Sequence, residues 1–210
     1  VNFNDHAFFF QRAHEPLVYT HSVASLEKMS AHAGATGTPP QGNEVLAAFG
    51  KLFVADFSTD KSTIYWSDTL DGTTWTGGAT GSIDITNVWP TGYDEIVALA
   101  AHNGFLIIFG KDSIVIYSGA SAPASMTLED TISNIGCVSR DCVVSTGKDL
   151  IFLDRSGVRS LARTIQEKSS PIGDISKNVN NDVKNLIASE TGNIKMHYSP
   201  DESFVLVNFP

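Results

Sequence analysis

Short hydrophobic runs bounded by Gly, Asn, Asp or Ser dominate the chain. Most are rich in β-branched and aromatic residues, which is typical of strands. Clear examples lie at 52–55, 63–66, 105–109, 114–117 and 150–153. Polar segments at 58–62, 110–113 and 154–157 separate paired runs, and their Gly and Asp residues suit tight turns. The pattern therefore predicts a series of β-hairpins.

The hairpins recur along the chain. Four units share the order turn, hydrophobic strand, tight turn and second strand, and the last unit, which starts at Ser199, is incomplete. Aligned positions in these units are 54, 45 and 54 residues apart: Leu52, Leu106, Ile151 and Val205. Further strand-like segments, at 44–48, 94–100 and 137–144, precede the first three units. A period of about 40 to 50 residues with several strands per unit is typical of β-propeller blades.

We therefore predict an all-β fold of β-propeller-like blades, three complete and one truncated. The predicted propeller segment spans 44–210, with blades at about 44–90, 94–133 and 137–170 and a truncated blade at 192–210. Residues 1–43 precede it as leading strands, around 8–10 and 17–19, and a loop at 34–42, and they could belong to an incomplete blade. A lone four-stranded sheet cannot bury both of its faces, so blades must stack around a shared axis.

One segment departs from the β pattern. Between Pro171 and Ala188, hydrophobic residues recur three and four positions apart, which places them in one stripe on a helix. The stripe consists of Ile172, Ile175, Val179, Val183, Leu186 and Ile187. We predict one short amphipathic helix around 174–188 that packs on the body of the protein, with Asp174 or Ser176 as its N-cap. A helix that binds a partner is the alternative.

Composition and charge narrow the functional classes. Hydrophobic residues make up 42% and charged residues 18% of the chain, as in folded proteins. The formal net charge is −9 and no stretch is basic, so a surface that neutralises DNA phosphates is not expected. No hydrophobic run approaches the roughly 20 residues of a membrane span, and no signal-peptide pattern is present. Because the chain starts at Val1 and ends in a strand-like run, we expect a piece of a longer protein.

Candidate metal ligands are few and unfavourably spaced. Cys137 and Cys142 supply at most half of a tetrahedral zinc site, and no histidine is near them in sequence. Two buried thiols in a reducing compartment are the predicted state. Four N-terminal histidines are 8, 7 and 11 residues apart, unlike the short spacings of metal sites; they are His6, His14, His21 and His32. We predict no metal site and no cofactor.

Residues 67–75, Ser-Asp-Thr-Leu-Asp-Gly-Thr-Thr-Trp, loosely resemble the Asp-box turn of sialidases and related glycosidase propellers. That pattern reads S-x-D-x-G-x-x-W, whereas here Asp and Gly are adjacent and the serine is displaced. The box is a structural hairpin in those enzymes and carries no catalytic group.

Arginine placement also argues against a sialidase, which needs several arginines that converge on a carboxylate. Three of the five arginines crowd one predicted strand-turn-strand hairpin, where they would form a solvated edge; the five are Arg12, Arg140, Arg155, Arg159 and Arg163. Acid pairs for glycoside hydrolysis cannot be recognised among 23 acidic residues. We predict no catalytic residues and no enzymatic activity. A carbohydrate-active, glycosidase-like propeller or a carbohydrate-binding propeller is the alternative.

Three parts of the sequence resemble one family of viral proteins. They are the run 82–111, the segment 135–139 with the downstream 157–161, and the segment 171–176. They resemble the tail nozzle family of short-tailed bacteriophages, also called tail tubular protein B or packaged-DNA stabilisation (hub) protein. The resemblance covers about residues 1–210 and is most specific from Asp56 to Val183.

The resemblance implies a structural virion protein with a β-propeller, six copies of which form a homo-hexamer ring. The ring surrounds the DNA exit channel, retains the genome and guides it during ejection, while double-stranded DNA passes without specific binding. The implied partners are the phage adaptor and portal and the tail fibre or needle proteins. The implied location is the phage tail, after assembly in the host cytoplasm, with no membrane insertion by this segment. An acidic wall is compatible with this role, because a conduit for a polyanion should not bind phosphate strongly.

Overall fold

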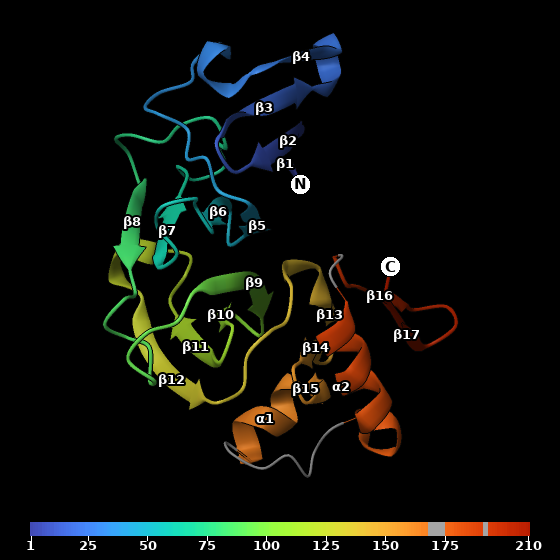
Figure 1. The fold of residues 1–210 in the computed structure, drawn as a ribbon. Helices are drawn as coiled ribbons and strands as arrows, with labels where there is room; N and C mark the ends of the chain where they lie inside the picture. Colours follow the sequence, from blue (N-terminus) through green and yellow to red (C-terminus); the bar gives the residue numbers. More distant parts are fainter. Residues whose placement is uncertain (168–174, 191–192) are drawn as a thin grey trace. The chain divides into compact units, whose positions relative to one another are not determined.

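The structure is a computed structural model that describes residues 1–167, 175–190 and 193–210 (Figure 1). It is mostly β, with several small antiparallel sheets and short helices, which confirms the predicted β-rich class. The chain divides into two compact units. The first contains 1–88, 104–106 and 117–129, and the second contains 89–103, 107–116 and 130–210. The predicted domain boundary after residue 43 stays a prediction.

The N-terminal sheet is a four-stranded antiparallel meander with the order β1-β2-β3-β4. Its elements are β1 (Asn2–Phe3), β2 (His6–Gln11), β3 (His14–Thr20), η1 (His21–Val23), β4 (Ser25–Lys28) and η2 (Met29–Ala31). Phe8 of β2 lies opposite Val18 of β3, and both are buried with Met29 and Leu52 in the core of the first unit. The predicted strand pair is confirmed, and residues 34–42 form a loop as predicted.

The second sheet repeats the meander with the order β5-β6-β7-β8. Its strands are β5 (Glu44–Ala48), β6 (Lys51–Ala55), β7 (Thr63–Trp66) and β8 (Gly81–Asp84). All five residues of β6 are buried, which explains why its sequence is nearly continuous in hydrophobic residues rather than alternating.

The third sheet has the same sequential order, from β9 to β12. Its elements are β9 (Ile96–His102), β10 (Phe105–Gly110), β11 (Ser113–Ser118), η3 (Pro123–Ser125) and β12 (Thr127–Ser133). Asn103 and Gly104 join β9 to β10 with φ angles of +49° and +82°. Asn-Gly adopts this left-handed pair of conformations at low cost, so the dipeptide directs a two-residue hairpin turn here.

The remaining strands form a three-stranded sheet and a hairpin. They are β13 (Val143–Ser145), β14 (Leu150–Asp154), β15 (Gly157–Ser160), β16 (Lys195–Ser199) and β17 (Phe204–Asn208), with η4 (Arg140–Cys142) before β13. The strand predicted at 137–144 is wrong over most of its length. The segment turns at η4, where Cys142 N–H donates to Ser139 O and the Cys142 side chain is buried.

The predicted hairpin turns are confirmed at 58–62, 110–113 and 154–157, which join β6 to β7, β10 to β11 and β14 to β15. The four aligned hydrophobic positions each lie in the second strand of their sheet: Leu52 in β6, Leu106 in β10, Ile151 in β14 and Val205 in β17. The repeat read from the sequence is therefore a repeat of strand order.

A helix that the sequence analysis did not anticipate follows β15. The third blade was predicted as β structure over about 137–170, but after the strand that follows the 154–157 turn, Leu161 begins α1 (Leu161–Glu167). Leu161 and Thr164 are the buried residues of this helix, and Thr164 Oγ1 donates to Ser160 O at 2.7 Å. Burial three residues apart marks one helical face, which a short seven-residue element reveals only weakly in sequence.

The predicted helix around 174–188 is present but begins later. It consists of η6 (Lys177–Val179) and α2 (Asn180–Ser189), while Ile172 and Asp174 lie outside the described residues. Ser176 does not cap α2, whose N-cap residue is Val179 and makes no side-chain cap bond. Instead, Ser176 Oγ accepts the N–H of Val158 at 2.8 Å, so it ties this segment to β15.

The hydrophobic stripe of this segment is only partly buried. Val183 and Ile187 pack against the core of the second unit, whereas Ile175, Val179 and Leu186 are exposed. The prediction that the helix packs on the body of the protein is therefore confirmed for one side of the stripe. Among the helices of the described residues, none is both long and apolar enough to cross a membrane.

The core of the second unit is formed by strands from successive repeats. Phe109 of β10 and Phe152 of β14 are fully buried, and their ring centroids are 5.1 Å apart. Ile107 and Leu153 belong to the same cluster, as does Met196 of β16. Consecutive sheets of this unit thus share hydrophobic side chains, which each sheet alone could not bury.

Candidate functional sites

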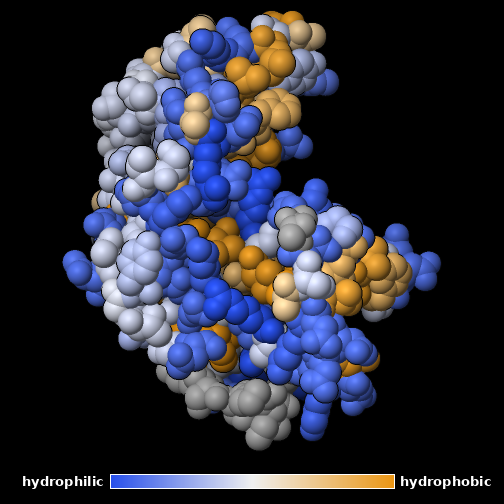
Figure 2. Space-filling view, viewed as in Figure 1, coloured by the Kyte–Doolittle hydropathy of each residue, from blue (hydrophilic) through white to orange (hydrophobic). Residues whose placement is uncertain are grey.

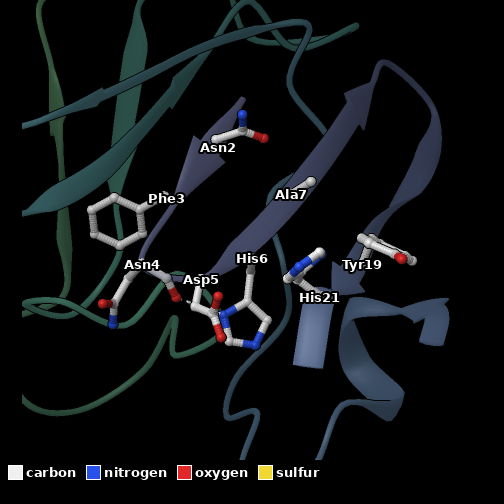
Figure 3. A pocket seen from close by; sticks show the side chains of 8 residues that line it. All are labelled: Asn2, Phe3, Asn4, Asp5, His6, Ala7, Tyr19 and His21. Atoms are coloured by element: carbon white, nitrogen blue, oxygen red, sulfur yellow. Dashed lines mark hydrogen bonds between the residues drawn. The ribbon is translucent and has the colours of Figure 1, made fainter. Parts of the chain in front are cut away.

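An open hollow of about 450 Å³ lies beside the N-terminal sheet in the first unit. Asn4 and Asp5 form the turn between β1 and β2 with φ angles of +45° and +66°, which Asn and Asp tolerate better than most residues. The turn brings their polar groups to the start of β2. Figure 3 shows the lining residues, which are Asn2, Phe3, Asn4, Asp5, His6, Ala7, Tyr19 and His21.

His6 carries the most versatile chemistry in this hollow. Its Nδ1 lies 2.9 Å from the carbonyl oxygen of Asn4, and because a carbonyl only accepts, Nδ1 holds the proton. In the neutral ring Nε2 is then an acceptor. The ring packs edge-on against His32 at 5.2 Å, and His32 Nδ1 lies 2.9 Å from Glu27 Oε1. The hollow can therefore accept a hydrogen bond from a small polar group.

Two of the four N-terminal histidines that were considered as metal ligands, His6 and His32, are in ring contact. His21 joins His6 in lining the hollow, whereas His14 is exposed at the start of β3. Across residues 1–167, 175–190 and 193–210, no group of three or more His, Cys, Asp or Glu side chains could hold a metal ion.

The stretch that resembles an Asp box lies in the long connection between β7 and β8 of the first unit. Asp68 Oδ1 accepts the N–H groups of Ala79 at 2.9 Å and Thr69 at 2.7 Å, and these bonds lower the pKa of Asp68. Burial alone would raise the pKa of Asp71, but bonds donated by Thr73 outweigh it and lower that pKa. Both carboxylates thus serve to fold the loop.

A buried lysine in β6 donates hydrogen bonds to the same loop. Lys51 of β6 is 1% exposed, and its Nζ donates to Ser67 O at 3.2 Å, Thr69 Oγ1 at 3.0 Å and Ala79 O at 3.1 Å. Burial lowers the pKa of Lys51, and the nearby Asp68 carboxylate partly opposes this effect. The three bonds join both ends of the loop to the sheet, so the arrangement is structural.

The five arginines do not converge on one site. Four of them bind different acids: Arg12 binds Asp56, Arg140 binds Asp141, Arg155 binds Asp112 and Arg159 binds Asp154. The predicted solvated edge is wrong for Arg159, whose side chain is buried in β15, and the predicted strand context is wrong for Arg163, which lies in α1. The environment of Arg159 follows from its contact with a buried acid, which its sequence neighbours do not reveal.

Both cysteines are buried thiols outside any disulfide, which confirms the predicted buried thiols. Cys137 Sγ donates to Ser139 O at 3.1 Å, and Cys142 Sγ donates to Ile194 O at 3.2 Å. Burial, with a contribution from the Asp141 charge, raises the pKa of Cys142 to about 12, so this thiol is protonated and unreactive near neutral pH. The reducing compartment stays a prediction.

Three buried aspartates that the sequence pattern did not predict as buried lie beside the turns that follow the second strand of three sheets. Asp56 follows β6 and is about 5% exposed. It accepts bonds from Lys61 Nζ at 2.8 Å and Asn43 Nδ2 at 3.2 Å, and it also pairs with Arg12.

The other two aspartates hold the equivalent turns of the second unit. Asp94 accepts the N–H groups of Lys111 and Asp112, each at 2.9 Å. Asp154 accepts the N–H of Ser156 at 3.1 Å and that of Gly136 at 3.2 Å. In the sequence, each of these aspartates stands next to a hydrophobic strand. That position alone does not predict burial, because burial depends on contacts from elsewhere in the chain.

Comparison with known proteins does not assign a family. No protein-family model matches the chain, and no curated protein matches it. Strand order, surface character and charge are therefore the features that bear on function.

Proposed function

We propose that the chain is a β-propeller segment of a structural virion protein, a subunit of the tail nozzle ring of a short-tailed bacteriophage. The repeated meander carries this proposal. Three sheets run through four strands in sequence order, and a fourth, β13-β14-β15, runs through three. The aligned hydrophobic residue lies in the second strand of each repeat from β6 onward. Successive four-stranded meanders are the building units of propellers.

Exposed hydrophobic side chains support a role in a larger assembly. Phe9 and Leu26 of the N-terminal sheet are 55% and 58% exposed, and Phe204 and Leu206 of the β16–β17 hairpin are 49% and 52% exposed. Figure 2 shows hydrophobic surface over both the N-terminal sheet and this hairpin. Several exposed hydrophobic residues on one sheet face favour contact with another sheet or subunit.

The charge supports a wall around DNA rather than a DNA-binding surface. The net charge is −9 per chain, so a six-membered ring would carry about −54 before counterions. Such a wall repels the phosphate backbone and lets DNA slide, whereas a protein that grips DNA needs clustered positive charge. In this proposal DNA passes without specific binding, and the ring contacts the portal, adaptor and tail fibre or needle proteins in the phage tail.

The test is the assembly state of the purified chain. Native mass measurement together with negative-stain electron microscopy should show a particle of six chains with a central hole. A stable monomer at assembly concentrations, or a closed dimer with no hole, would contradict the nozzle proposal. A panel of glycans, incubated with the same sample, tests the alternative: turnover that disappears on substitution of a single acid would replace the structural role with an enzymatic one.

A further inference from the structure

A second hollow, of about 350 Å³, lies within the second unit and has an unusual charge for this acidic chain. Its described lining contains three cationic side chains, Lys111, Arg155 and Lys184, and no acidic one. The other lining residues are Cys137, Val138, Ile187 and Ala188. Two tight turns and helix α2 supply the charges, while hydrophobic residues form much of the remaining wall.

The two turns are held rigidly by buried aspartates. Lys111 lies in the β10–β11 turn, whose backbone N–H groups bind both carboxylate oxygens of Asp94. Arg155 lies in the β14–β15 turn, where Asp154 accepts the N–H of Ser156. These bonds fix the turn backbone from which the exposed side chains of Lys111 and Arg155 extend. A fixed backbone lowers the part of the entropic cost of binding that comes from ordering the loops.

Close packing holds residues 136–138 between the two turns, where Cys137 and Val138 line the hollow. Cys137 N–H donates to Gly110 O at 2.8 Å, and Val138 N–H donates to Leu153 O at 2.9 Å. A Cβ atom at Gly136 would lie 2.3 Å from the backbone of Lys111, so only glycine permits this approach. The segment before η4 is thereby held against both turns, with its apolar side chains facing the hollow.

The existing ion pairs of these cations leave them available. Lys111 Nζ lies 2.7 Å from Glu95 Oε2 and Arg155 Nη1 lies 2.8 Å from Asp112 Oδ1; Lys111, Arg155 and Asp112 are exposed, and Glu95 is partly exposed. Exposed pairs of this kind are worth about 0 to 1 kcal/mol, so a ligand with higher charge can replace them. Lys184, exposed on α2, forms no ion pair within the described part of the chain.

We propose that this hollow, the Lys111 hollow, binds a small phosphate-bearing molecule. The three cations would contact the phosphate oxygens, with Arg155 able to donate two parallel hydrogen bonds. Val138, Ile187 and Ala188 would contact an apolar part of the ligand, which favours an organic phosphate over the bare ion. The hollow is too small and too local to follow a DNA backbone, so a free phosphate ester is the expected ligand rather than duplex DNA.

The test uses adenosine diphosphate, inorganic pyrophosphate and a short DNA duplex as probes in calorimetry at about 150 mM salt, where weak surface attraction is screened. Adenosine diphosphate should bind in a saturable manner and more tightly than pyrophosphate. Lys184→Gln should weaken binding about tenfold. Lys148→Gln, an equal charge change at an exposed residue outside the lining, should leave it unchanged.

Methyl signals of Val138 and Ile187 in NMR spectra locate the bound ligand, which calorimetry does not. Shifts at these methyls on addition of adenosine diphosphate support the proposal. Absence of binding, equal weakening by Lys184→Gln and Lys148→Gln, or tighter binding of the DNA duplex than of adenosine diphosphate would overturn it. The far-ultraviolet circular dichroism of both variants should match that of the unmodified chain, because both lysines are exposed.

Discussion

At the scale of single residues, buried charge organises the turns of this protein. Asp56, Asp94 and Asp154 are nearly inaccessible, yet each accepts bonds from turn groups or from a cation. Lys51 plays the complementary role beneath the β7–β8 loop. A buried charge is tolerated only when its hydrogen-bonding capacity is used, so these residues should be sensitive to loss of a partner.

The neighbouring arginines of one hairpin provide a matched comparison. Arg159→Met should destabilise the protein by about 3 kcal/mol, because it leaves the buried Asp154 carboxylate without its cation. Arg155→Met should cost no more than about 1 kcal/mol, because Arg155 and Asp112 are both exposed. Urea denaturation of both variants measures the difference. Equal losses of unfolding free energy would show that burial does not govern these pairs.

The lowered pKa of Asp68 predicts that acid destabilises the connection between β7 and β8. Bonds from Ala79 and Thr69 lower its folded-state pKa below the ordinary value of 3.8, so the ionised carboxylate stabilises the fold. This stabilisation is fully present above the unfolded-state pKa and is lost as the pH falls through the lower folded-state pKa. Asp68→Asn should therefore lower the urea midpoint at pH 6, and the difference should shrink towards pH 2. Asp201→Asn, at an exposed turn residue, is the control, and a pH-independent difference for Asp68→Asn would contradict the argument.

At the scale of elements, the strands follow their sequence patterns more closely than the helices do. The hydrophobic runs of β6, β10 and β14 are each bounded by turn residues, and each forms a strand buried over most of its length. In contrast, α1 was not predicted and begins directly after β15, and the predicted helix around 174–188 contains the 3-10 turn η6 before α2. Helix ends depend on contacts from elsewhere in the chain: Ser176, which precedes η6, accepts the N–H of Val158 in β15 and does not cap α2.

Strand β10 offers a test of the buried face. Ile107 is 2% exposed, so Ile107→Asp should destabilise the protein by about 4 kcal/mol or more and abolish the ring assembly proposed above. Phe105→Asp, at a residue 36% exposed on the same strand, should cost about 1 to 2 kcal/mol. Thermal denaturation and native mass measurement separate the two outcomes. A folded, assembled Ile107→Asp protein would be incompatible with the observed core.

At the scale of the whole molecule, the chain combines repeated sheets with an acidic net charge. Sheets of the same strand order follow one another along the chain, and exposed hydrophobic residues remain on the N-terminal sheet and on the C-terminal hairpin. In the assembly proposed above, these two unlike apolar surfaces would contact each other head to tail on neighbouring copies, an arrangement that closes into a ring when the rotation between neighbours permits. The acidic net charge then gives such a ring a wall that does not retain DNA by electrostatic attraction.

The sequence alone determined most of the strands, the turns and the repeat, because these depend on local hydrophobic patterns and on residues such as Asn103 and Gly104 with special backbone preferences. It also determined the net charge. Tertiary structure decided which polar residues are buried, because partners of Asp94, Asp154 and Arg159 come from other turns or strands. Only tertiary structure could gather Lys111, Arg155 and Lys184 around one hollow, since charges far apart in sequence meet only when their elements pack.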